Sequence, residues 1–430
     1  MAICAAERCC ASGLLTSILF AFLLSGCEPS VPPFTCTDAI GCTDIAPGAP
    51  IKLGGLMALS GFEAPQGIDG SRAAELAFDD WDNKILGHPI ALQAEDTECS
   101  GGGGMTAALK LVADPEVVAI LAVSCSVASV PAAKIMSEAG LSMVSGDNTL
   151  PSLTAVAGEA GGDWQPGYFR TIHNDVDQGR AAATFAFREL GVRKVATIDA
   201  DDPYTQGLAR VFAQVFTELG GDVVLATAVN KGDTNMAPVL TTVANSGAEL
   251  LFFPIFHPEA SYIVVQAKRV DGLDRLRLMG AEIQLRPDFI DAVGTDGIGL
   301  YLVGPAMPTG EAYDELVARY KAKFGEAPIG TYHAQSYDAT HLLLGAIAGA
   351  AVQEEDGTLH IGRQALRDWL YAVDDFDGLT GRLSCDEFGD CGATRFDIMR
   401  LENPAAGLAG FANSVIYSLG GEESTPDSGS

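Results

Sequence analysis

The stretch Ile51-Lys52-Leu53-Gly54-Gly55-Leu56-Met57-Ala58 decides the fold of this chain. It is a short apolar run, a loop with glycines follows over 61–70, and residues 71–83 then carry apolar side chains at helical spacing. A buried strand that leads through a loop into a helix is the repeating unit of α/β proteins. We therefore expect a parallel sheet that begins with the strand 51–58.

The same alternation continues outward from this unit. The expected strands lie at 90–94, 117–123, 141–144, 194–199, 222–228, 250–254 and 276–280, and the expected helices at 105–112, 128–139, 178–190, 206–219, 236–244 and 259–270. Further helices are expected at 311–324, 333–351 and 362–373, and short strands at 379–384, 394–400 and 414–418. Strands that alternate with helices indicate parallel sheets. Two such series meet near Phe169-Arg170-Thr171, so we expect an α/β protein with two similar, doubly wound lobes.

The length and composition permit a large core. The chain has 430 residues, 48% of them hydrophobic and 19% charged, and at roughly 150 residues per domain it holds two or three domains. Lys and Arg total 26 against 56 Asp and Glu, which gives a formal net charge of −30. An acidic surface of this kind repels phosphate backbones, so the composition excludes a nucleic-acid-binding protein.

The first residues resemble an export signal. The apolar run over 14–24 has the length of a signal-peptide core and is too short to span a bilayer comfortably. It ends in Leu24-Ser25-Gly26-Cys27, which resembles the bacterial lipobox, where the cysteine sulfur receives the lipid. We expect a lipoprotein signal peptide over 1–26, lipidation of Cys27 and a Pro-rich linker over 27–49, with an ordinary signal peptide as the alternative. The mature protein would then be periplasmic or at the cell surface, tethered by its lipid to a bacterial membrane.

The remaining cysteines suggest disulfides. Six cysteines lie beyond Cys27, and their spacings suggest the pairs Cys36–Cys42, Cys99–Cys125 and Cys385–Cys391. A zinc site is the alternative, although zinc sites favour cysteines closer in sequence with matching histidines, and the six His of this chain are scattered. The spacing favours disulfides and no metal, and it leaves the connectivity open.

Polar residues follow several of the expected strands. In doubly wound sheets, ligands bind outside the C-terminal ends of the strands, where helix N-termini present N–H groups. The first series places the hydroxyls of Ser126 and Thr149 there, and the second series places the ring of Tyr204 and the carboxylate of Glu282. This set suits a small zwitterion, whose carboxylate would meet Ser126 and Thr149 and whose ammonium would meet Glu282.

Structural alternatives exist for each of these features. In the structural alternative for Tyr204, this residue serves only to begin a helix. In the alternative for Glu282, this residue is a solvated acid in a loop. The acid-rich stretch 199–202 resembles a metal cluster but is also typical of a loop with Asx turns. The glycines at 101–104 precede a helix as in a phosphate loop, but the complete motif is not present, and Ser100 as a helix N-cap is the interpretation that we favour.

Several segments occur in an order that is typical of one protein family. They are 51–61, Cys99 with Ser124-Cys125-Ser126, Ser145-Gly146-Asp147-Asn148-Thr149 with Pro151 and Leu153-Thr154, 202–210, Pro258-Glu259, Met279-Gly280-Ala281-Glu282 and 380–386. With them the chain resembles, over nearly all of 50–417, the type I periplasmic solute-binding proteins of ABC transporters. The resemblance is to the branch that binds leucine, isoleucine and valine, the branched-chain amino acids.

The resemblance implies ligand-binding residues in the first lobe. Ser126 and Thr149 match residues that hold the ligand carboxylate. Asp147 and Asn148 fall where backbone atoms meet the ligand. The Cys99–Cys125 pair matches a disulfide beside the pocket of the branched-chain branch.

The resemblance also implies ligand-binding residues around the rest of the pocket. Tyr204 matches an aromatic wall on the second lobe, and Glu282 matches the acid that pairs with the α-ammonium. Gln66 stands where the family often has an aromatic side chain, and Phe256 stands where a second tyrosine is usual. Because both departures change the pocket lining, a polar amino acid, an amide or a urea-like solute is an alternative to a branched-chain amino acid.

The family's architecture divides the chain into two lobes. An N-terminal lobe over 50–170 and 306–376 and a C-terminal lobe over 171–305 and 377–417 would be joined by three crossings, near 170, 305 and 377, with a disordered tail over 418–430. The expected function is that of an extracytoplasmic lipoprotein that binds a small solute, in particular an amino acid, in the cleft and delivers it to the permease subunits of an ABC transporter. A ligand-sensing receptor of the same fold, without transport, is the alternative.

Enzymatic function is not supported by the motifs. The chain has no G-x-S-x-G motif, and no histidine has a spacing that signals a catalytic triad. Cys125 follows a strand as a nucleophile would, but pairing with Cys99 would leave no thiolate. We therefore expect a binding protein without a cofactor, and not an enzyme on another α/β fold.

Overall fold

The computed structural model describes residues 34–392, 395–412 and 414–420. The expected signal peptide over 1–26 and the expected lipid acceptor Cys27 lie outside the described residues. Both sheets and their helices belong to the compact unit that begins at Cys36.

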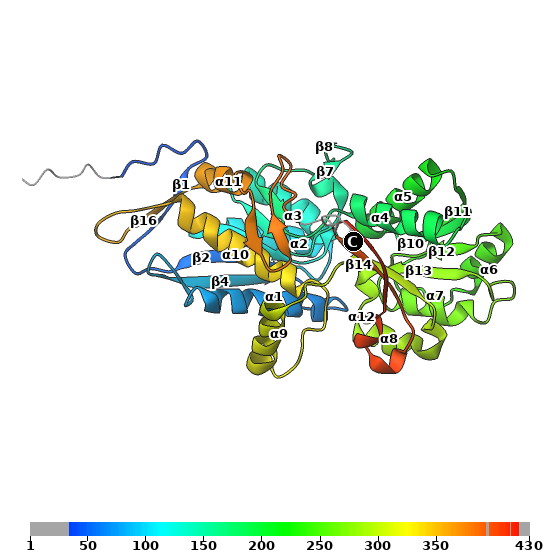
Figure 1. Cartoon of the computed structure of the whole chain (residues 1–430). Helices are drawn as coiled ribbons and strands as arrows, with labels where there is room; N and C mark the ends of the chain where they lie inside the picture. Colours follow the sequence, from blue (N-terminus) through cyan, green and yellow to red (C-terminus); the bar gives the residue numbers. More distant parts are fainter. Residues whose placement is uncertain (1–33, 393–394, 413, 421–430) are drawn as a thin grey trace, which may run out of the picture. The chain divides into compact units, whose positions relative to one another are not determined.

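The first sheet has six strands in the order β3-β4-β2-β5-β6-β9. Figure 1 shows two of its neighbouring strands, β2 and β4, side by side. Neighbours from β4 to β9 run parallel, and the short β3 pairs antiparallel with β4. The bounds are Lys84–Ile85 for β3, His88–Asp96 for β4, Ile51–Met57 for β2, Val117–Val123 for β5, Met143–Ser145 for β6 and Tyr168–Arg170 for β9. This order brings together the loops that follow β2, β5 and β6 at the carboxyl edge of the sheet.

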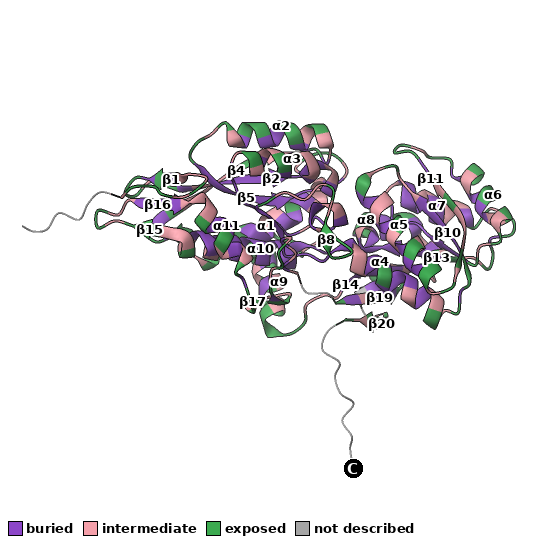
Figure 2. Ribbon diagram, turned by 90° about the horizontal axis from the view of Figure 1, so that it is seen from above, coloured by how far each residue is buried: buried purple, intermediate pink, exposed green. Residues whose placement is uncertain are grey.

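Helices cover both faces of the first sheet. They are α1 (Ala64–Asp80), α2 (Gly101–Val112), α3 (Ser126–Glu138), α10 (His333–Ala350) and α11 (Arg363–Tyr371), and α9 (Glu311–Phe324) packs on α1. All residues of β5 are buried, because Leu121 and Val123 pack against α1, α10 and α11 while Ile120 and Ala122 pack against α2 and α3. Alternate side chains of a strand point to opposite faces, so a continuous apolar run suits a strand that is covered on both sides. Figure 2 colours β2 and β5 mainly as buried.

The second sheet has seven strands in the order β11-β10-β12-β13-β14-β19-β20. Neighbours from β11 to β14 run parallel, and β19 and β20 are antiparallel additions. The bounds are Asp222–Ala228 for β11, Lys194–Asp199 for β10, Leu250–Phe252 for β12, Arg277–Ala281 for β13, Tyr301–Pro305 for β14, Phe396–Arg400 for β19 and Val415–Leu419 for β20.

Helices also cover both faces of the second sheet. They are α4 (Asp175–Thr184), α5 (Pro203–Glu218), α6 (Ala237–Ser246), α7 (Glu259–Ala267), α8 (Pro287–Val293) and the short α12 (Ala409–Ala412). Leu251 of β12 packs in a core with α6, α7 and α8, and its neighbour Phe252 packs in the core with α4 and α5. The predicted α/β class with two parallel sheets is therefore confirmed.

Two helices begin at least four residues earlier than expected. Helix α1 begins at Ala64 instead of residue 71, with Pro65 in its first turn, where proline is tolerated. Helix α2 begins at Gly101, and its N-cap Ser100 accepts a hydrogen bond from the N–H of Gly103 at 3.0 Å, so the N-cap interpretation is confirmed. A Cβ on Gly104 would lie 2.1 Å from the carbonyl oxygen of Ala128, so this glycine allows α2 to approach α3 closely.

Several elements were not expected from the sequence. They are α8, β14 and a three-stranded sheet of β1 (Cys42–Ile45), β16 (Leu359–Gly362) and β15 (Ala351–Gln353). Strand β1 pairs antiparallel with β16, and its Ile45 is buried in the first core. The chain from Cys36 to Ala49 is therefore part of the fold and not the linker that we expected over 27–49, because its short strand finds a partner far away in the sequence.

The position at which the chain crosses for the last time from the first sheet to the second also differs from expectation. The hairpin β17 (Phe376–Gly378) and β18 (Gly381–Leu383) packs with the first core through Phe376, and the N–H of Leu379 donates to Asp338 of α10 at 2.7 Å. The chain therefore stays with the first sheet as far as Cys391, instead of leaving it near 377. At the other end β20 includes Leu419, so the expected tail over 418–430 begins later, and 421–430 lie outside the described residues. The division of the chain into two lobes as a whole stays a prediction.

The six cysteines form the three predicted disulfides, Cys36–Cys42, Cys99–Cys125 and Cys385–Cys391. The structure thus selects disulfides over the zinc alternative. Within the described part of the chain, no three His, Cys, Asp or Glu side chains are grouped so that they could hold a metal ion.

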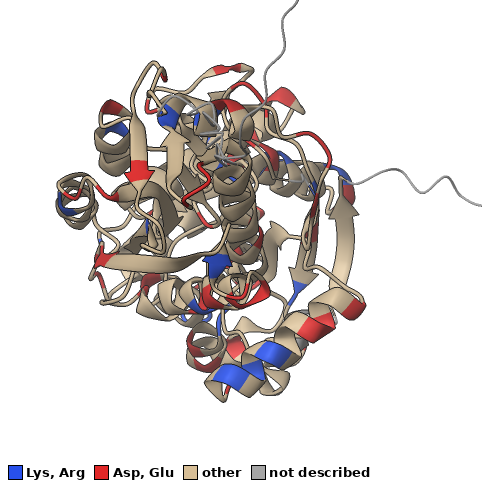
Figure 3. Ribbon diagram, turned by 90° about the vertical axis from the view of Figure 1, so that its left-hand side faces the viewer, with Lys and Arg blue, Asp and Glu red and all other residues tan. Residues whose placement is uncertain are grey.

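The distribution of charged residues over the structure agrees with the acidic composition. Figure 3 shows acidic residues on many separate elements, in line with 56 acids against 26 bases in the chain. Among the residues that the structure describes, no helix is long and apolar enough to span a membrane.

Candidate functional site

A cavity of about 170 Å³ lies where the carboxyl edges of the two sheets meet. Six of the eight predicted ligand residues line it: Gln66, Ser126, Asp147, Thr149, Tyr204 and Phe256. The other two, Asn148 and Glu282, are buried directly behind this lining. The residues that were predicted because they follow strands of the two series therefore lie around one cavity.

The first wall of the cavity contains unpaired backbone N–H groups. Helix α3 begins at Ser126, right after β5, and the first N–H groups of a helix have no partner within it. Those of Ser126 and Val127, together with the N–H of Thr149, have no hydrogen-bond partner among the described residues. The Ser126 hydroxyl accepts from the N–H of Leu150 at 3.4 Å, which ties this loop to the helix. These donors form a site suited to an anionic group.

Asp147 lies on the same wall. Its Oδ1 accepts from the N–H of Ser124 at 2.9 Å and from the hydroxyl of Ser145 at 3.3 Å. Burial raises the pKa of the Asp147 carboxyl well above its usual range, and the nearby Glu63 carboxylate raises the pKa further. The side chain of Asn148 is buried behind Asp147: its amide nitrogen donates to Oδ1 of Asp147 at 3.5 Å, and its amide oxygen accepts from the Tyr168 hydroxyl at 3.3 Å.

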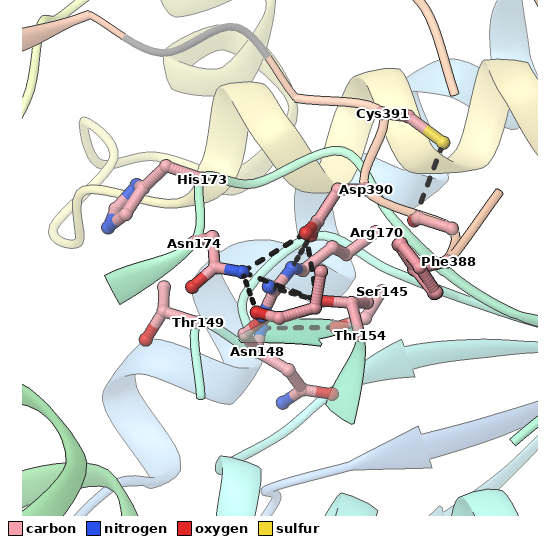
Figure 4. Close-up of polar contacts among 12 residues, drawn as sticks. Ser145, Asn148, Thr149, Thr154, Arg170, His173, Asn174, Phe388, Asp390 and Cys391 are labelled. Carbon is pink, nitrogen blue, oxygen red and sulfur yellow. Dashed lines mark hydrogen bonds and ion pairs between the residues drawn. The ribbon is translucent and has the colours of Figure 1, made fainter. Parts of the chain in front are cut away.

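Arg170 holds the loop that carries these residues (Figure 4). It is fully buried, and its Nη1 donates to the carbonyl oxygens of Asn148 at 3.1 Å and Leu150 at 2.9 Å. Its Nε pairs with Asp390, which also accepts from the amide of Asn174 at 3.1 Å. The 147–150 loop is therefore fixed by a buried cation that also binds the segment after Cys385.

The second wall is mainly aromatic. Phe256 follows β12, and its ring centre lies 5.6 Å from that of Tyr204 at the start of α5. Phe62, from the loop after β2, contacts Phe256 edge-on at 5.9 Å. These rings provide an apolar surface opposite the free N–H groups, with the geometry that aromatic pairs prefer.

Glu282 is a buried acid behind this wall. Only 1% of it is exposed, which rules out the alternative of a solvated loop acid. Its Oε1 accepts from the hydroxyls of Tyr204 at 2.9 Å and Tyr332 at 2.5 Å, and its Oε2 accepts from the amide of Gln178. Burial raises the pKa of Glu282, and the three donors oppose that rise. The two tyrosines line the cavity, so they stand between Glu282 and the enclosed space.

An ion pair bridges the rim of the cavity. Nη1 of Arg286, at the start of α8, lies 2.7 Å from Oε1 of Glu63, and its Nε lies 2.6 Å from Oδ1 of Asp288. Burial raises the pKa of Glu63 to about 7, although Arg286 acts to lower it. Lys231 lies nearby, with Nζ 4.0 Å from the centre of the Phe62 ring.

The sequence prediction did not include several lining residues with large or charged side chains, among them Phe62, Glu63, Lys231 and Tyr332. Phe62 and Glu63 follow β2 directly, so their position after a strand was a usable signal. Tyr332 precedes α10 and follows no strand, so the strand-end argument had no signal for it.

The acid-rich stretch 199–202 forms turns. Asp202 is the N-cap of α5 and accepts from the N–H of Thr205 at 3.1 Å, while Asp199 accepts from the N–H of Asp201 at 3.1 Å. The Asx-turn interpretation is therefore confirmed over the metal cluster.

The chain is similar to known solute-binding proteins. A family model described as "Periplasmic binding protein" matches residues 50–402. The Leu/Ile/Val-binding protein of Escherichia coli strain K12 is 25% identical over 371 residues, which cover 84% of this chain and 93% of that protein. A branched-chain amino acid transporter substrate-binding protein of Streptococcus pneumoniae, solved with isoleucine, has a TM-score of 0.71 at 22% identity and covers 86% of this chain and 98% of its own. An ABC transporter solute-binding protein of Rhodopseudomonas palustris, solved with benzoate, has a TM-score of 0.70 at 20% identity, with coverages of 87% and 98%.

These similarities agree with the two parallel sheets and the cavity between their carboxyl edges, and the predicted type I fold is confirmed. The family model spans most of the chain. The chain therefore belongs to the periplasmic binding protein family, and it is a solute-binding protein and not an enzyme.

Proposed function

We propose that this protein is an extracytoplasmic lipoprotein that binds an amino acid in its cavity and delivers it to an ABC permease. The observation that carries the proposal is the contrast between the two walls. The N–H groups of Ser126, Val127 and Thr149 are unpaired on one wall, and aromatic rings form the other. A small solute with a carboxylate and an apolar side chain fits both.

The carboxylate would bind at the start of α3. Backbone N–H groups at a helix N-terminus favour an anion, and the Ser126 hydroxyl can add a donor. The hydroxyl of Thr149 already donates to Asp175 at 3.0 Å, so Thr149 contributes its backbone N–H. The apolar part of the solute would then face Phe256 and Tyr204.

Direct contact between Glu282 and the ligand ammonium stays a prediction. Three donors occupy its oxygens, so an ammonium would have to displace the hydroxyl of Tyr204 or Tyr332 to reach it.

Delivery would use closure of the two lobes around the solute. A ligand shifts such an equilibrium only by its preference for the closed state, and the permease would recognise that state. The lipid on Cys27 would keep the protein at the membrane. A sensing role without transport is the alternative, and uptake of labelled solute that depends on the permease distinguishes the two.

An aromatic carboxylate is a second candidate ligand. The rings of Phe62, Tyr204 and Phe256 favour it, and benzoate is the ligand of one structural neighbour.

Calorimetry of the purified protein with L-leucine, L-arginine and benzoate tests the proposed ligand class. At a hundred times its dissociation constant, a true ligand adds about 2.7 kcal/mol to the free energy of unfolding. We expect an amino acid to bind, and Ser126→Ala to weaken binding about fivefold through loss of one hydrogen bond. Ser137→Ala, at the far end of the same helix, is the matched control. Binding of benzoate alone would contradict the amino acid proposal.

Membrane attachment is tested separately. Cys27→Ala is expected to move the protein from the membrane fraction to the soluble fraction, whereas Cys10→Ala should leave it membrane-bound.

A further inference from the structure

Asp147 has one carboxylate oxygen that no protein group uses. Its Oδ1 accepts from Ser124 and Ser145, whereas Oδ2 has no hydrogen-bond partner among the described residues. Oδ2 is also not among the fully enclosed atoms without a partner, so it borders accessible space, and the space beside Asp147 is the cavity.

The other acids of the lining are placed differently. Glu63 is paired with Arg286 at the rim, and Glu259 accepts from the N–H of Gly232 at 2.6 Å. Asp202 caps α5, and Asp201 is an exposed residue that accepts from the amide of Gln206 at 2.9 Å. Among the described acids of the lining, only Asp147 belongs to the loop that also carries the free N–H of Thr149.

The free N–H groups, which suit a negative group of the solute, therefore lie next to the Asp147 carboxyl, which suits a positive group. A solute carboxylate bound at the N–H groups of Ser126 and Thr149 would lie beside the carboxyl of Asp147. Two carboxylates so close repel each other in a poorly solvated cavity unless a cation or a proton lies between them. An α-amino acid carries its ammonium on the carbon next to its carboxylate, so its two charges can meet both subsites at once.

We propose that Asp147 Oδ2 binds the ammonium of the solute directly and thereby selects amino acids over solutes that carry only a carboxylate. The inference rests on the proposed function and assigns the positive group of the ligand to the first wall, with Glu282 as a positioning residue for Tyr204 and Tyr332. Burial of the unliganded carboxyl, which raises its pKa, agrees with a site that gains from a cation.

The test compares L-leucine with 4-methylpentanoate, which is leucine without its amino group, and with benzoate. In the unaltered protein, calorimetry should give L-leucine at least a tenfold higher affinity than either monocarboxylate. In Asp147→Asn, the affinity for L-leucine should fall at least tenfold, whereas that for the monocarboxylates should not fall. Asp222→Asn removes the same charge from the exposed start of β11, outside the cavity lining, and it should change each affinity less than threefold.

Each outcome decides between the two proposals. Unchanged binding of L-leucine by Asp147→Asn overturns the inference and leaves the proposed function intact. Equal affinity of the unaltered protein for leucine and 4-methylpentanoate does the same, and this comparison needs no variant to fold. Failure of the unaltered protein to bind L-leucine or L-arginine overturns the proposed function, and the inference with it.

Discussion

The two walls of the cavity each contain a buried acid, but the acids are built into the protein in different ways. Asp147 on the first wall uses one oxygen for the N–H of Ser124 and presents the other to the cavity. Glu282 on the second wall uses both oxygens for protein donors and is covered by Tyr204 and Tyr332. An acid with a free oxygen, such as Asp147, can bind a ligand directly. An acid with both oxygens engaged, such as Glu282, instead holds in place the side chains that line the cavity.

The walls also differ in the groups that form them. The first wall consists of backbone and short side chains that Arg170 and the α3 N-terminus hold in place. The second wall consists mainly of rings, of which Tyr204 and Tyr332 donate their hydroxyls to Glu282, and the Glu63–Arg286 pair joins it to the first wall at the rim. We therefore propose that the first wall recognises the charge of the solute and that the second wall encloses the solute.

The largest expected effect concerns the ion pair at the rim. The pKa of Glu63 rises from 4.5 to about 7 in the folded protein, so the folded state holds this proton to a higher pH than the unfolded chain does. The contribution of Glu63 to the free energy of unfolding therefore falls by about 3 kcal/mol as the pH rises from about 4.5 to 8. Glu63→Gln should lose this part of the pH dependence, as urea unfolding at the two pH values would show.

The control for this prediction is Glu326→Gln, which alters an exposed pair with Arg72. It should keep the pH dependence of the unaltered protein. If the free energy of unfolding of Glu63→Gln depends on pH as in the unaltered protein, the Glu63–Arg286 pair is solvated and does not join the two walls.

The second prediction concerns the packing that supports the first wall. A Cβ on Gly104 would lie 2.1 Å from the backbone oxygen of Ala128, so Gly104→Ala must push α2 away from α3. We expect the free energy of unfolding to fall by about 1–3 kcal/mol, with weaker ligand binding, because α3 carries Ser126. Gly102→Ala, in the same run of glycines, has nothing within 4 Å of the new Cβ and should instead raise the free energy of unfolding by up to about 1 kcal/mol. Equal effects of the two variants would contradict this packing.

The third prediction addresses Glu282 itself. Because two tyrosines separate it from the cavity, Glu282→Gln should weaken amino acid binding by less than about tenfold, less than Asp147→Asn does. Calorimetry of both variants with L-leucine measures the order. A loss of roughly ten- to a hundredfold for Glu282→Gln, as expected for a direct charge-assisted hydrogen bond, would show that the acid on the second wall reaches the ligand.

The smallest expected effect belongs to one hydroxyl of the second wall. Tyr204→Phe removes a donor to Glu282 but leaves those of Tyr332 and Gln178. The free energy of unfolding should fall by about 1 kcal/mol in urea unfolding, while the affinity for L-leucine changes less than threefold. A large loss of affinity would mean that this hydroxyl contacts the solute.

Much of the fold could be predicted because parallel strands that are covered on both faces are continuous apolar runs. β5 and the unit that begins at Ile51 are examples. β1 could not be predicted, since it is short and pairs with a partner more than three hundred residues away, and β16 is equally short although it also pairs with its neighbour β15. β14 was missed as well, although it is mostly buried, because its short run Tyr-Leu-Val-Gly-Pro ends in residues that usually indicate a turn.

Most of the candidate site could be predicted for a topological reason. The residues after parallel strands meet at one edge, so Ser126, Thr149 and Phe256 were placed correctly around the cavity. Tyr332 comes from a helix start that follows no strand, so no local pattern indicated it.

The sequence by itself determined most strands of the two sheets, how they alternate with helices, and which loops gather at the cavity, because apolar periodicity and chain order act locally. Only the tertiary structure decided which acids face the enclosed space. Whether a carboxylate is free, as Oδ2 of Asp147 is, or engaged, as in Glu282, depends on donors that arrive from distant parts of the chain, Tyr332 among them. Hydrogen bonds of this range leave no trace in the spacing of residues.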